Sequence, residues 1–404
     1  MQAETFRDLV LADPQLIESA WQFCEALPPH RLTKLVAVCV EDPLRFAFAF
    51  LKVLQCGGSP VLMPSPDELR DHGIGVVLDE HGLRGLDGQS VLLPREGSYF
   101  AFSSGSTGVR KPLRFDGERA LANAQAHAHS LGITAAQTIV QTLRLHHPFG
   151  VVAYLFTPLA TGARLQVGVY FDSVFPLQGD REDAVVHLTP YHLQFLMRRR
   201  VVSPGRIGKL TLGAGPVRRL EALYALGLGR EVFTTYGLSE AGPRVTTGKV
   251  EAATFVDGWV GRCIDGIQAK VEPDGCLWVN SPYHADDQPP WINTGDRVEL
   301  LTDGSLVFKN RLQDVLRIRG QTHPRAAYNH RLEQLLRLPC EICQRPYSDA
   351  LVIFIESARP QAQLETTLVR TMPELRGAEI RWIDNFERTA LGKTDLRKML
   401  LHTS

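Results

Sequence analysis

The periodicity of apolar and polar residues changes near Val245, and this change divides the chain into two regions. Before that residue, short apolar runs such as 35–40 and 209–212 alternate with segments of helical periodicity such as 43–55. Alternating strands and helices predict a mostly parallel sheet with helices on both faces. After Val245, short alternating strands separated by Asp-Gly pairs predict an antiparallel β-rich region. The Asp-Gly pairs occupy positions 257–258, 265–266, 274–275 and 303–304.

The first half also carries clear helix signals. Residues 4–27 predict two amphipathic helices, and one predicted apolar face consists of Leu16, Ala20, Phe23 and Leu27. Asp116 predicts the N-cap of an Ala-rich helix that runs to about Leu131. Further helices are predicted after residues 150, 189 and 216, and further strands at 60–63, 74–78, 99–102, 138–145, 184–188 and 231–235.

After residue 311 the alternation of strands and helices starts again. Strands are predicted at 315–319, 350–355 and 379–383, and helices at 324–338, 361–371 and from 394 onward. These elements predict a compact α+β unit of about 90 residues. The expected fold class is therefore α/β, with a large domain (1–312) of mostly parallel sheets plus a β-rich subdomain, and a small C-terminal α+β domain (313–404).

Composition narrows the possible environment and partners. Lys plus Arg equals Asp plus Glu at 44 each, so net charge gives no indication of a nucleic-acid or membrane-surface partner. Seven cysteines without the spacing of a disulfide framework are typical of a reducing compartment. For the single C-x-x-C at Cys340 and Cys343, a structural role is favoured over zinc binding or redox chemistry.

The N-terminal residues lack the features of a signal peptide, because acidic residues stand where basic and apolar ones are expected. The most apolar predicted helix, 43–55, contains Arg45 and Lys52 and is shorter than the ~20 residues of a membrane span. The expectation is a soluble, cytoplasmic protein without a membrane partner.

A loop rich in serine and glycine follows the predicted strand 99–102. Glycines allow close backbone approach to a ligand, and consecutive N–H groups and hydroxyls can surround an anion. Lys111 adds a positive charge just beyond it. The loop does not have the Walker spacing, and taken alone it fits either a turn or a phosphate site. It consists of Ser103, Ser104, Gly105, Ser106, Thr107 and Gly108.

Three more polar, glycine-bearing segments follow predicted strands, at 213–216, 235–240 and 294–296. Parallel sheets bind ligands in crevices outside the carboxyl ends of their strands. Together with Arg311 and Gly392-Lys393, these segments resemble the adenylate-forming superfamily of acyl- and aryl-CoA synthetases, peptide-synthetase adenylation domains and luciferases. The matching motifs, in the family's order, are S-S-G-S-T-G-V-R-K, H-H-P-F-G, T-Y-G-L-S-E-A-G, N-T-G-D-R, N-R-L-Q-D-V-L-R-I-R-G and E-R-T-A-L-G-K-T-D.

The resemblance implies a two-step reaction. A substrate carboxylate would attack the α-phosphate of ATP, with Mg²⁺, to give an acyl-adenylate, and the acyl group would then pass to a thiol. That thiol would belong to coenzyme A or to the phosphopantetheine of an acyl carrier protein. Similarity to aryl and cinnamate-type ligases around Glu240 favours a small aryl acid over a fatty or amino acid.

The resemblance also implies residue roles. Lys393, Glu240 and Lys111 would be catalytic, with Glu240 beside the metal. Tyr236 would stack on adenine and Asp296 would accept hydrogen bonds from the ribose hydroxyls. Arg311 would reach the ribose or a phosphate. The remaining nucleotide-binding residues would be the serine-glycine loop with Gly213, Ala214, Gly215, Thr235, Gly237 and Ser239. The acid would lie against His147, Phe149, Gly150, Gly237 and Gly242.

Each of these residues also has an ordinary structural interpretation, and His147 fits a pocket wall and a core histidine equally well. The rival function is a non-catalytic nucleotide- or acyl-binding protein with the same fold. The chain is shorter than typical family members, and Gln313 stands where the family usually has Asp or Lys at the hinge before a mobile C-terminal lid. These departures bear on thiol transfer more than on adenylation.

Overall fold

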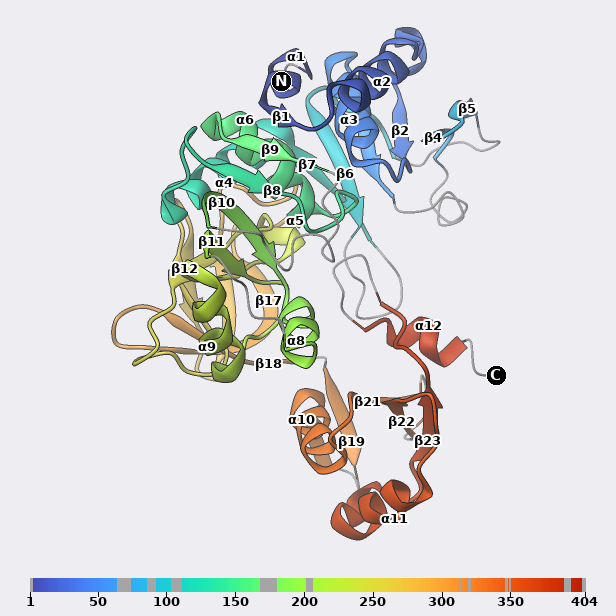
Figure 1. Cartoon of the computed structure of the whole chain (residues 1–404), viewed down its shortest axis with the longest axis vertical. Coiled ribbons are helices and arrows are strands. Elements are labelled where there is room, and N and C mark those ends of the chain that lie inside the picture. Colours follow the sequence, from blue (N-terminus) through green and yellow to red (C-terminus); the bar gives the residue numbers. More distant parts are fainter. Residues whose placement is uncertain are drawn as a thin grey trace.

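The protein is described from a computed structural model that covers residues 3–63, 74–85, 92–102, 111–167, 180–200, 206–312, 314–318, 321–345, 348, 350–388 and 394–401 (Figure 1). Two large sheets make up most of it, with order β1-β9-β8-β10-β11-β12-β13-β14-β18-β17-β16-β15 in one and β5-β4-β2-β3-β6-β7 in the other. The C-terminal elements form a separate three-stranded sheet, β21-β22-β23, and a two-stranded ribbon, β19-β20.

The twelve-stranded sheet changes character at Val245, as predicted. Its first six strands pair in parallel, and every pairing from β12 onward is antiparallel. The parallel strands are β1 (Val10–Leu11), β9 (Arg164–Gln166), β8 (Thr138–Val140), β10 (Arg181–Leu188), β11 (Ile207–Leu212) and β12 (Gly229–Tyr236). The antiparallel strands are β13 (Thr246–Lys249), β14 (Trp259–Cys263), β18 (Leu306–Arg311), β17 (Ile292–Leu300), β16 (Cys276–Asn280) and β15 (Gln268–Val271).

The four Asp-Gly pairs predicted as turns in this region are confirmed. Gly258, Gly266, Gly275 and Gly304 all adopt positive φ, between +78° and +83°. Side chains other than glycine rarely take that conformation, so these positions determine where each strand turns back.

The six-stranded sheet has a parallel centre and antiparallel edges. Its strands are β2 (Leu35–Val38), β3 (Ser59–Leu62), β4 (Val76–Asp79), β5 (Gly82–Gly85), β6 (Ser98–Phe102) and β7 (Pro112–Asp116). Alternate residues of β2 face two different cores: Val36 and Val38 join the main core, and Leu35 and Ala37 join a smaller cluster on the other face.

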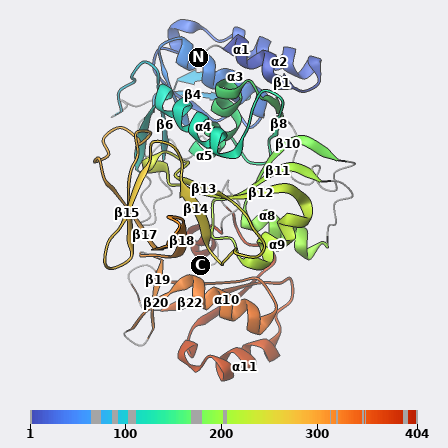
Figure 2. The ribbon, with the colours of Figure 1, turned by 90° about the vertical axis from the view of Figure 1, so that its left-hand side faces the viewer.

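Helices fill the main core between the sheets and cover the outer face of the large one. The main core joins α1 (Ala3–Leu9), α2 (Pro14–Glu25), α3 (Pro43–Gln55), α4 (Gly117–Leu131), α5 (Pro148–Val151), the π-helix η3 (Val152–Phe156) and α6 (Thr157–Thr161). A second core places α8 (Pro190–Arg198) and α9 (Arg219–Leu228) against β10, β11 and β12. The predicted parallel sheet with helices on both faces is therefore confirmed (Figure 2).

Local helix signals were mostly reliable. Helix α3 has the predicted bounds, and Asp116 caps α4 by accepting hydrogen bonds from the backbone N–H groups of Glu118 and Arg119. The predicted apolar face of α2 was wrong at Leu16, which is 60% exposed. The face that is buried instead carries Ala20, Cys24 and Leu27, because those residues point toward α3.

Two further predictions about this half needed correction. The strand predicted at 138–145 ends at Val140. The side-chain amide of the next residue, Gln141, donates a hydrogen bond to the carbonyl of Leu143. The apolar helix after residue 150 is interrupted by the π-helix, whose carbonyl of Val152 accepts a hydrogen bond from Thr157 Oγ1 (2.8 Å). A π-helical turn is not visible in apolar periodicity.

The C-terminal segment lies at the end of the molecule opposite the N-terminal helices in both views (Figures 1 and 2). It comprises β19 (Val315–Ile318), β20 (Gln321–Pro324), α10 (Arg325–Leu336), β21 (Cys340–Gln344), β22 (Leu351–Glu356), α11 (Ala362–Thr371), β23 (Glu379–Ile383) and α12 (Leu396–Leu401). The prediction missed β20 and β21. Division into domains at residue 313, and motion of the second one, stay predictions.

Strand β21 explains the C-x-x-C pair. Cys340 joins the core under α10, whereas Cys343 joins a cluster on the opposite face of the same sheet. Both are buried free thiols, and burial raises their pKa to about 12 and about 11. The structural interpretation of this pair is confirmed. Within the described residues, no helix is both long and apolar enough to cross a membrane.

Candidate functional site

Two of the predicted site residues converge on the buried carboxylate of a third. Asp296 is 1% exposed and accepts a hydrogen bond from Tyr236 Oη at 2.7 Å. Arg311 donates to both of its oxygens, through Nε at 2.7 Å and Nη2 at 3.2 Å. Such a two-pronged contact to a carboxylate fixes orientation as well as charge. These residues come from β12, β17 and β18, which are distant in sequence.

Strand pairing creates this cluster. Asp296 and Arg311 are direct cross-strand partners in the β17–β18 ladder, so their side chains project from the same face. The turn before Asp296 is held by Asn293, which accepts from the N–H of Gly295 at 2.9 Å, and by Thr294, which accepts from the N–H of Asp296 at 3.1 Å. Gly295 adopts φ +68°, which accounts for the glycine of the N-T-G-D-R motif.

The electrostatics of the cluster keep Tyr236 neutral and Arg311 charged. Burial, and then the neighbouring Asp296, raise the pKa of Tyr236 well above its ordinary value, so its hydroxyl stays a donor. Burial alone would lower the pKa of Arg311, but its bonds to Asp296 outweigh that effect and raise it. The cluster therefore presents a fixed cation and a fixed anion side by side.

Glu240 lies next to this cluster in the short helix η4 (Ser239–Ala241), and its charge contributes to the raised pKa of Arg311. Its backbone carbonyl accepts from Ala285 at 3.0 Å, which ties the motif to the antiparallel region. Among the residues that the structure describes, no group of three or more His, Cys, Asp or Glu side chains could hold a metal. A single carboxylate still fits Mg²⁺, which commonly binds one or two carboxylates plus substrate phosphates and water.

The predicted nucleotide-binding segment 213–216 has an unusual backbone. Ala214 adopts φ +66°, a conformation that is strained for a residue with a side chain. A Cβ at Gly213 would lie 2.7 Å from Thr235 Cγ2, so glycine is required for these two strand ends to meet. The Thr235 hydroxyl is buried and has no hydrogen-bond partner among the described residues. An unsatisfied buried hydroxyl beside this strained backbone suits a polar ligand such as a nucleotide.

The predicted acid-binding segment 147–150 is a helix start. His147 caps α5, since its Nδ1 accepts from the N–H of Phe149 at 3.1 Å. A Cβ at Gly150 would lie 2.2 Å from the carbonyl of Arg144, so this glycine is required by packing. The Phe149 ring is 7% exposed and lies against the guanidinium of Arg244, whose Cζ is 3.4 Å from the ring centroid. Arg244 was not singled out from the sequence.

Packing also explains Gly242, the last residue predicted to line the acid site. It has φ +89°, and a Cβ there would lie 2.9 Å from the carbonyl of Tyr283. Its N–H donates to Ser239 at 3.3 Å, closing the turn around Glu240. Glycine is therefore needed to hold the Glu240 segment against the antiparallel strands.

Gly237 is the position where a substitution should be most disruptive to the segment. A Cβ there would lie 2.0 Å from the carbonyl oxygen of Pro243, so Gly237→Ala is expected to lower the free energy of unfolding by about 2 kcal/mol. Gly227→Ala in α9 is the control, because nothing lies within 4 Å of its added methyl, and it should be neutral or stabilising. Urea denaturation measures both. Equal stability of the two variants would contradict this packing.

Comparison with known proteins finds a family that matches part of the chain, including Tyr236 and Glu240. Residues 87–280 match the family described as AMP-binding enzyme. The solved o-succinylbenzoate coenzyme A synthetase from Bacillus subtilis superposes with TM-score 0.74 at 20% identity, covering 95% of this chain and 92% of that one. The anthranilate coenzyme A ligase AuaEII superposes with TM-score 0.69 at 15% identity, covering 99% and 91%. At these identities the likeness shows a shared fold, and the expected fold class is confirmed.

Sequence relatives of the chain include a nonribosomal peptide synthetase of Neosartorya fischeri, 26% identical over 369 residues. The match covers 71% of this chain but 16% of that protein. The chain therefore spans only a small part of that relative.

Several of the predicted site residues lie outside the described residues. These are the loop Ser103–Gly108, Lys393 and the hinge position Gln313, so their roles stay predictions. Lys111 is described and exposed at the start of β7.

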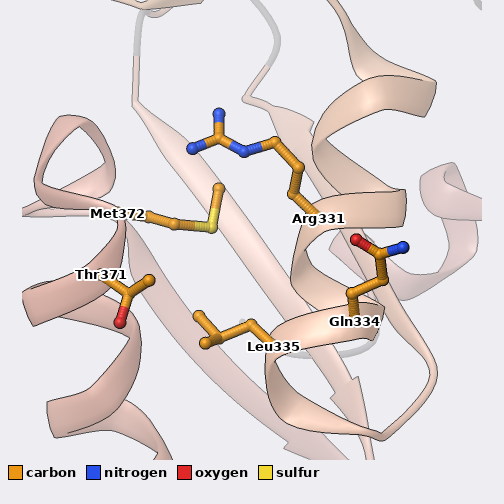
Figure 3. Close-up of a pocket in the computed structure, with 5 residues that line it drawn as sticks. All are labelled: Arg331, Gln334, Leu335, Thr371 and Met372. Atoms are coloured by element: carbon orange, nitrogen blue, oxygen red, sulfur yellow. The ribbon is translucent and has the colours of Figure 1, made fainter.

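One described pocket lies away from all of these positions, between α10 and the end of α11 (Figure 3). Its lining consists of Arg331, Gln334, Leu335, Thr371 and Met372. Arg331 pairs with Glu374 at 2.9 Å, which satisfies the one charge in it. None of the predicted site residues contributes to this pocket.

Proposed function

We propose that this chain activates a carboxylic acid with ATP and Mg²⁺ as an acyl-adenylate and then transfers the acyl group to a thiol. The observation that carries the proposal is the Tyr236–Asp296–Arg311 cluster next to Glu240, within a chain whose residues 87–280 match AMP-binding enzymes. A neutral phenol, a fixed carboxylate and a fixed guanidinium supply the donor, acceptor and charge that a nucleotide's base, ribose and phosphates need.

In this proposal each residue performs one task. Asp296 retains acceptor capacity beyond its three protein hydrogen bonds, since a carboxylate offers about four lone-pair sites, and it accepts from ribose hydroxyls. Arg311 stays charged beside the phosphates, and the Tyr236 ring supports adenine. The Thr235 hydroxyl and the strained backbone at Ala214 face the nucleotide from the neighbouring strand ends.

The chemistry depends on charge stabilisation more than on proton transfer. Attack of a carboxylate on the α-phosphate brings two anions together, so preorganised cations and donors lower the barrier. Lys111 and Lys393 supply ammonium groups, and the serine-glycine loop supplies donors to the outer phosphates. Mg²⁺ held beside Glu240 would neutralise phosphate charge.

The proposed acid is a small aryl carboxylate, and the proposed acceptor is coenzyme A or carrier-protein phosphopantetheine. Two relatives of similar fold are named for aryl acids, o-succinylbenzoate and anthranilate, and both names specify coenzyme A. Because one relative is a peptide synthetase, a carrier protein is the alternative acceptor in this proposal. Phe149 offers an aromatic surface, which favours a planar ring by about 0.5–1.5 kcal/mol beyond area burial.

ATP–pyrophosphate exchange across a panel of acids tests the proposal. Acid-dependent exchange is expected, with aryl acids preferred over alkyl chains of similar size. Nucleotide binding without exchange for any acid in the panel would favour the rival function, a non-catalytic nucleotide- or acyl-binding protein. Preference for a long alkyl chain would reject the aryl assignment and leave adenylation standing.

A further inference from the structure

Arg244 is a buried cation without a hydrogen-bond partner. Its side chain is 0% exposed and is the largest of the fully buried side chains. None of its three guanidinium nitrogens has a hydrogen-bond partner within the part of the chain that is described. A buried charge is stable only when it is paired or hydrogen-bonded, so such a group signals a missing acceptor.

Four groups that the described residues place beside Arg244 carry no negative charge. They are Phe149 from α5, His127 from α4, His187 from β10 and Tyr154 from η3. Burial lowers the pKa of Arg244 to about 9, so it remains protonated near neutral pH. Burial, reinforced by Arg244, lowers the pKa of both histidines well below the ordinary value, so both are neutral.

Both histidines add unsatisfied polar atoms to the same cluster. The Nε2 atoms of His127 and His187 are buried and have no partner among the described side chains and backbone. His187 Nδ1 is engaged by Thr211 Oγ1, which fixes the ring. Two neutral imidazoles beside a guanidinium can donate to an anion without adding charge.

The chain holds Arg244 rigidly in this place. Asn123 of α4 binds its backbone on both sides, donating to its carbonyl at 2.9 Å and accepting from its N–H at 3.2 Å. The Phe149 ring covers one face of the guanidinium. The N–H groups of Arg244 lie in the plane of its guanidinium, so stacking on Phe149 leaves them able to donate hydrogen bonds. The geometry is therefore preorganised for a planar acceptor.

The cluster adjoins the predicted site. Arg244 follows Glu240 by four positions, and a Cβ at Gly237 would lie 3.1 Å from its backbone nitrogen. Phe149 also approaches Gly213, where a Cβ would be 3.6 Å from its Cε2 atom. An acid whose reacting carboxylate lies near Glu240 therefore extends toward Arg244.

We propose that Arg244, with His127 and His187, binds a second anionic group of the substrate, so that the acid activated here is a diacid. This inference rests on the proposed function, since it names the class of acid. Because the cluster is closed to solvent, the acid must displace a side chain to enter. Phe149, at 7% the most exposed of the surrounding four, is the one that we expect to move.

Direct binding tests the inference without ATP. Calorimetric titration of the full chain would compare succinate, glutarate, isophthalate and terephthalate with analogues in which a methyl group replaces one carboxylate, at constant ionic strength. At least one diacid is expected to bind about tenfold or more tightly than its methyl partner, because a bidentate carboxylate contact is lost in the partner. Equal binding within every pair would overturn the inference.

Substitutions of Arg244 test whether this residue causes the preference for diacids over their methyl analogues. Arg244→Met keeps an apolar stem and should abolish the preference, and Arg244→Lys should keep it with affinity about tenfold lower. Arg262→Met, at an exposed arginine paired with Asp303, is the matched control and should bind as the wild type does. Thermal unfolding confirms that each variant is folded. If Arg244→Met does not fold, the Lys variant decides, and an undiminished affinity in either variant would reject the inference.

Two further comparisons separate this inference from its alternatives. Sulfate that binds as tightly as the best diacid, and only when Arg244 is present, would indicate a structural anion site instead of a substrate site. In pyrophosphate exchange, equal kcat/KM for diacids and monoacids would reject the inference and leave the proposed function standing. Arg244-dependent diacid binding without any exchange would support diacid binding by Arg244 but reject both the proposed function and the activation of the bound diacid.

Discussion

Asp296→Asn is expected to reduce ATP–pyrophosphate exchange by ~10²–10³, the usual cost of losing one preorganised electrostatic group. The substitution removes the charge that Arg311 and Tyr236 share but keeps the shape of the side chain. The amide of the introduced asparagine would also place its N–H groups against the N–H donors of Arg311, where no hydrogen bond can form. Stability should fall by about 2 kcal/mol, less than for a fully buried pair because Arg311 is partly exposed. Exchange kinetics and urea denaturation measure the two effects.

Asp287→Asn is the matched control for that prediction. Asp287 is 82% exposed and adopts φ +67°, a conformation that asparagine tolerates, so neither activity nor stability should change. A loss of stability in Asp296→Asn with unchanged KM for ATP and unchanged exchange would show that the cluster is structural only. That outcome would remove the observation on which the proposed function rests.

Lys393→Ala is expected to reduce adenylate formation by a similar factor of ~10²–10³ while ATP affinity stays within about threefold. The reason is chemical: a compact ammonium on a flexible stem can stand between the substrate carboxylate and the α-phosphate as they approach. The prediction rests on the G-K-T-D motif, because the side chain lies outside the described residues. Single-turnover formation of the acyl-adenylate, with ATP binding measured separately, checks it.

Lys398→Ala provides the control, since this exposed lysine of α12 removes the same charge from the same segment. Its exchange rate should match that of the wild type. If Lys393→Ala also forms adenylate at the wild-type rate, Lys393 has no part in the first step. If instead its ATP affinity falls in proportion to its rate, it holds the nucleotide and does not act on the transition state.

The C-terminal segment touches the large sheet's outer helices through charged side chains. Arg198 of α8 pairs with Glu356 at 3.5 Å, and Arg218 pairs with Glu333 at 3.4 Å. Arg388 stacks on Tyr191, with Cζ 3.9 Å from the ring centroid. In both pairs the arginine is partly exposed, and ion pairs open to solvent contribute little, typically about 0–1 kcal/mol. Such contacts are compatible with the predicted motion of the lid about Gln313.

Much of this architecture could be predicted because its causes are local. The N-cap of α4, the bounds of α3 and the positive-φ glycines of the Asp-Gly turns depend on residues adjacent in the chain. The switch from parallel to antiparallel pairing near Val245 followed from a change in periodicity and turn chemistry. The ordered motifs likewise pointed to the family that residues 87–280 match.

The sequence by itself determined the elements, their order and the polar segments at the strand ends. The tertiary structure alone decided that Asp296 and Arg311 stand opposite each other, that Leu16 is exposed, and that Cys340 and Cys343 lie in separate cores. It also buried Arg244 among groups from α4, α5, η3 and β10, with no hydrogen-bond partner for its guanidinium among the described residues. Burial and electrostatic pairing depend on residues brought together from distant positions, and no local pattern records which ones will meet.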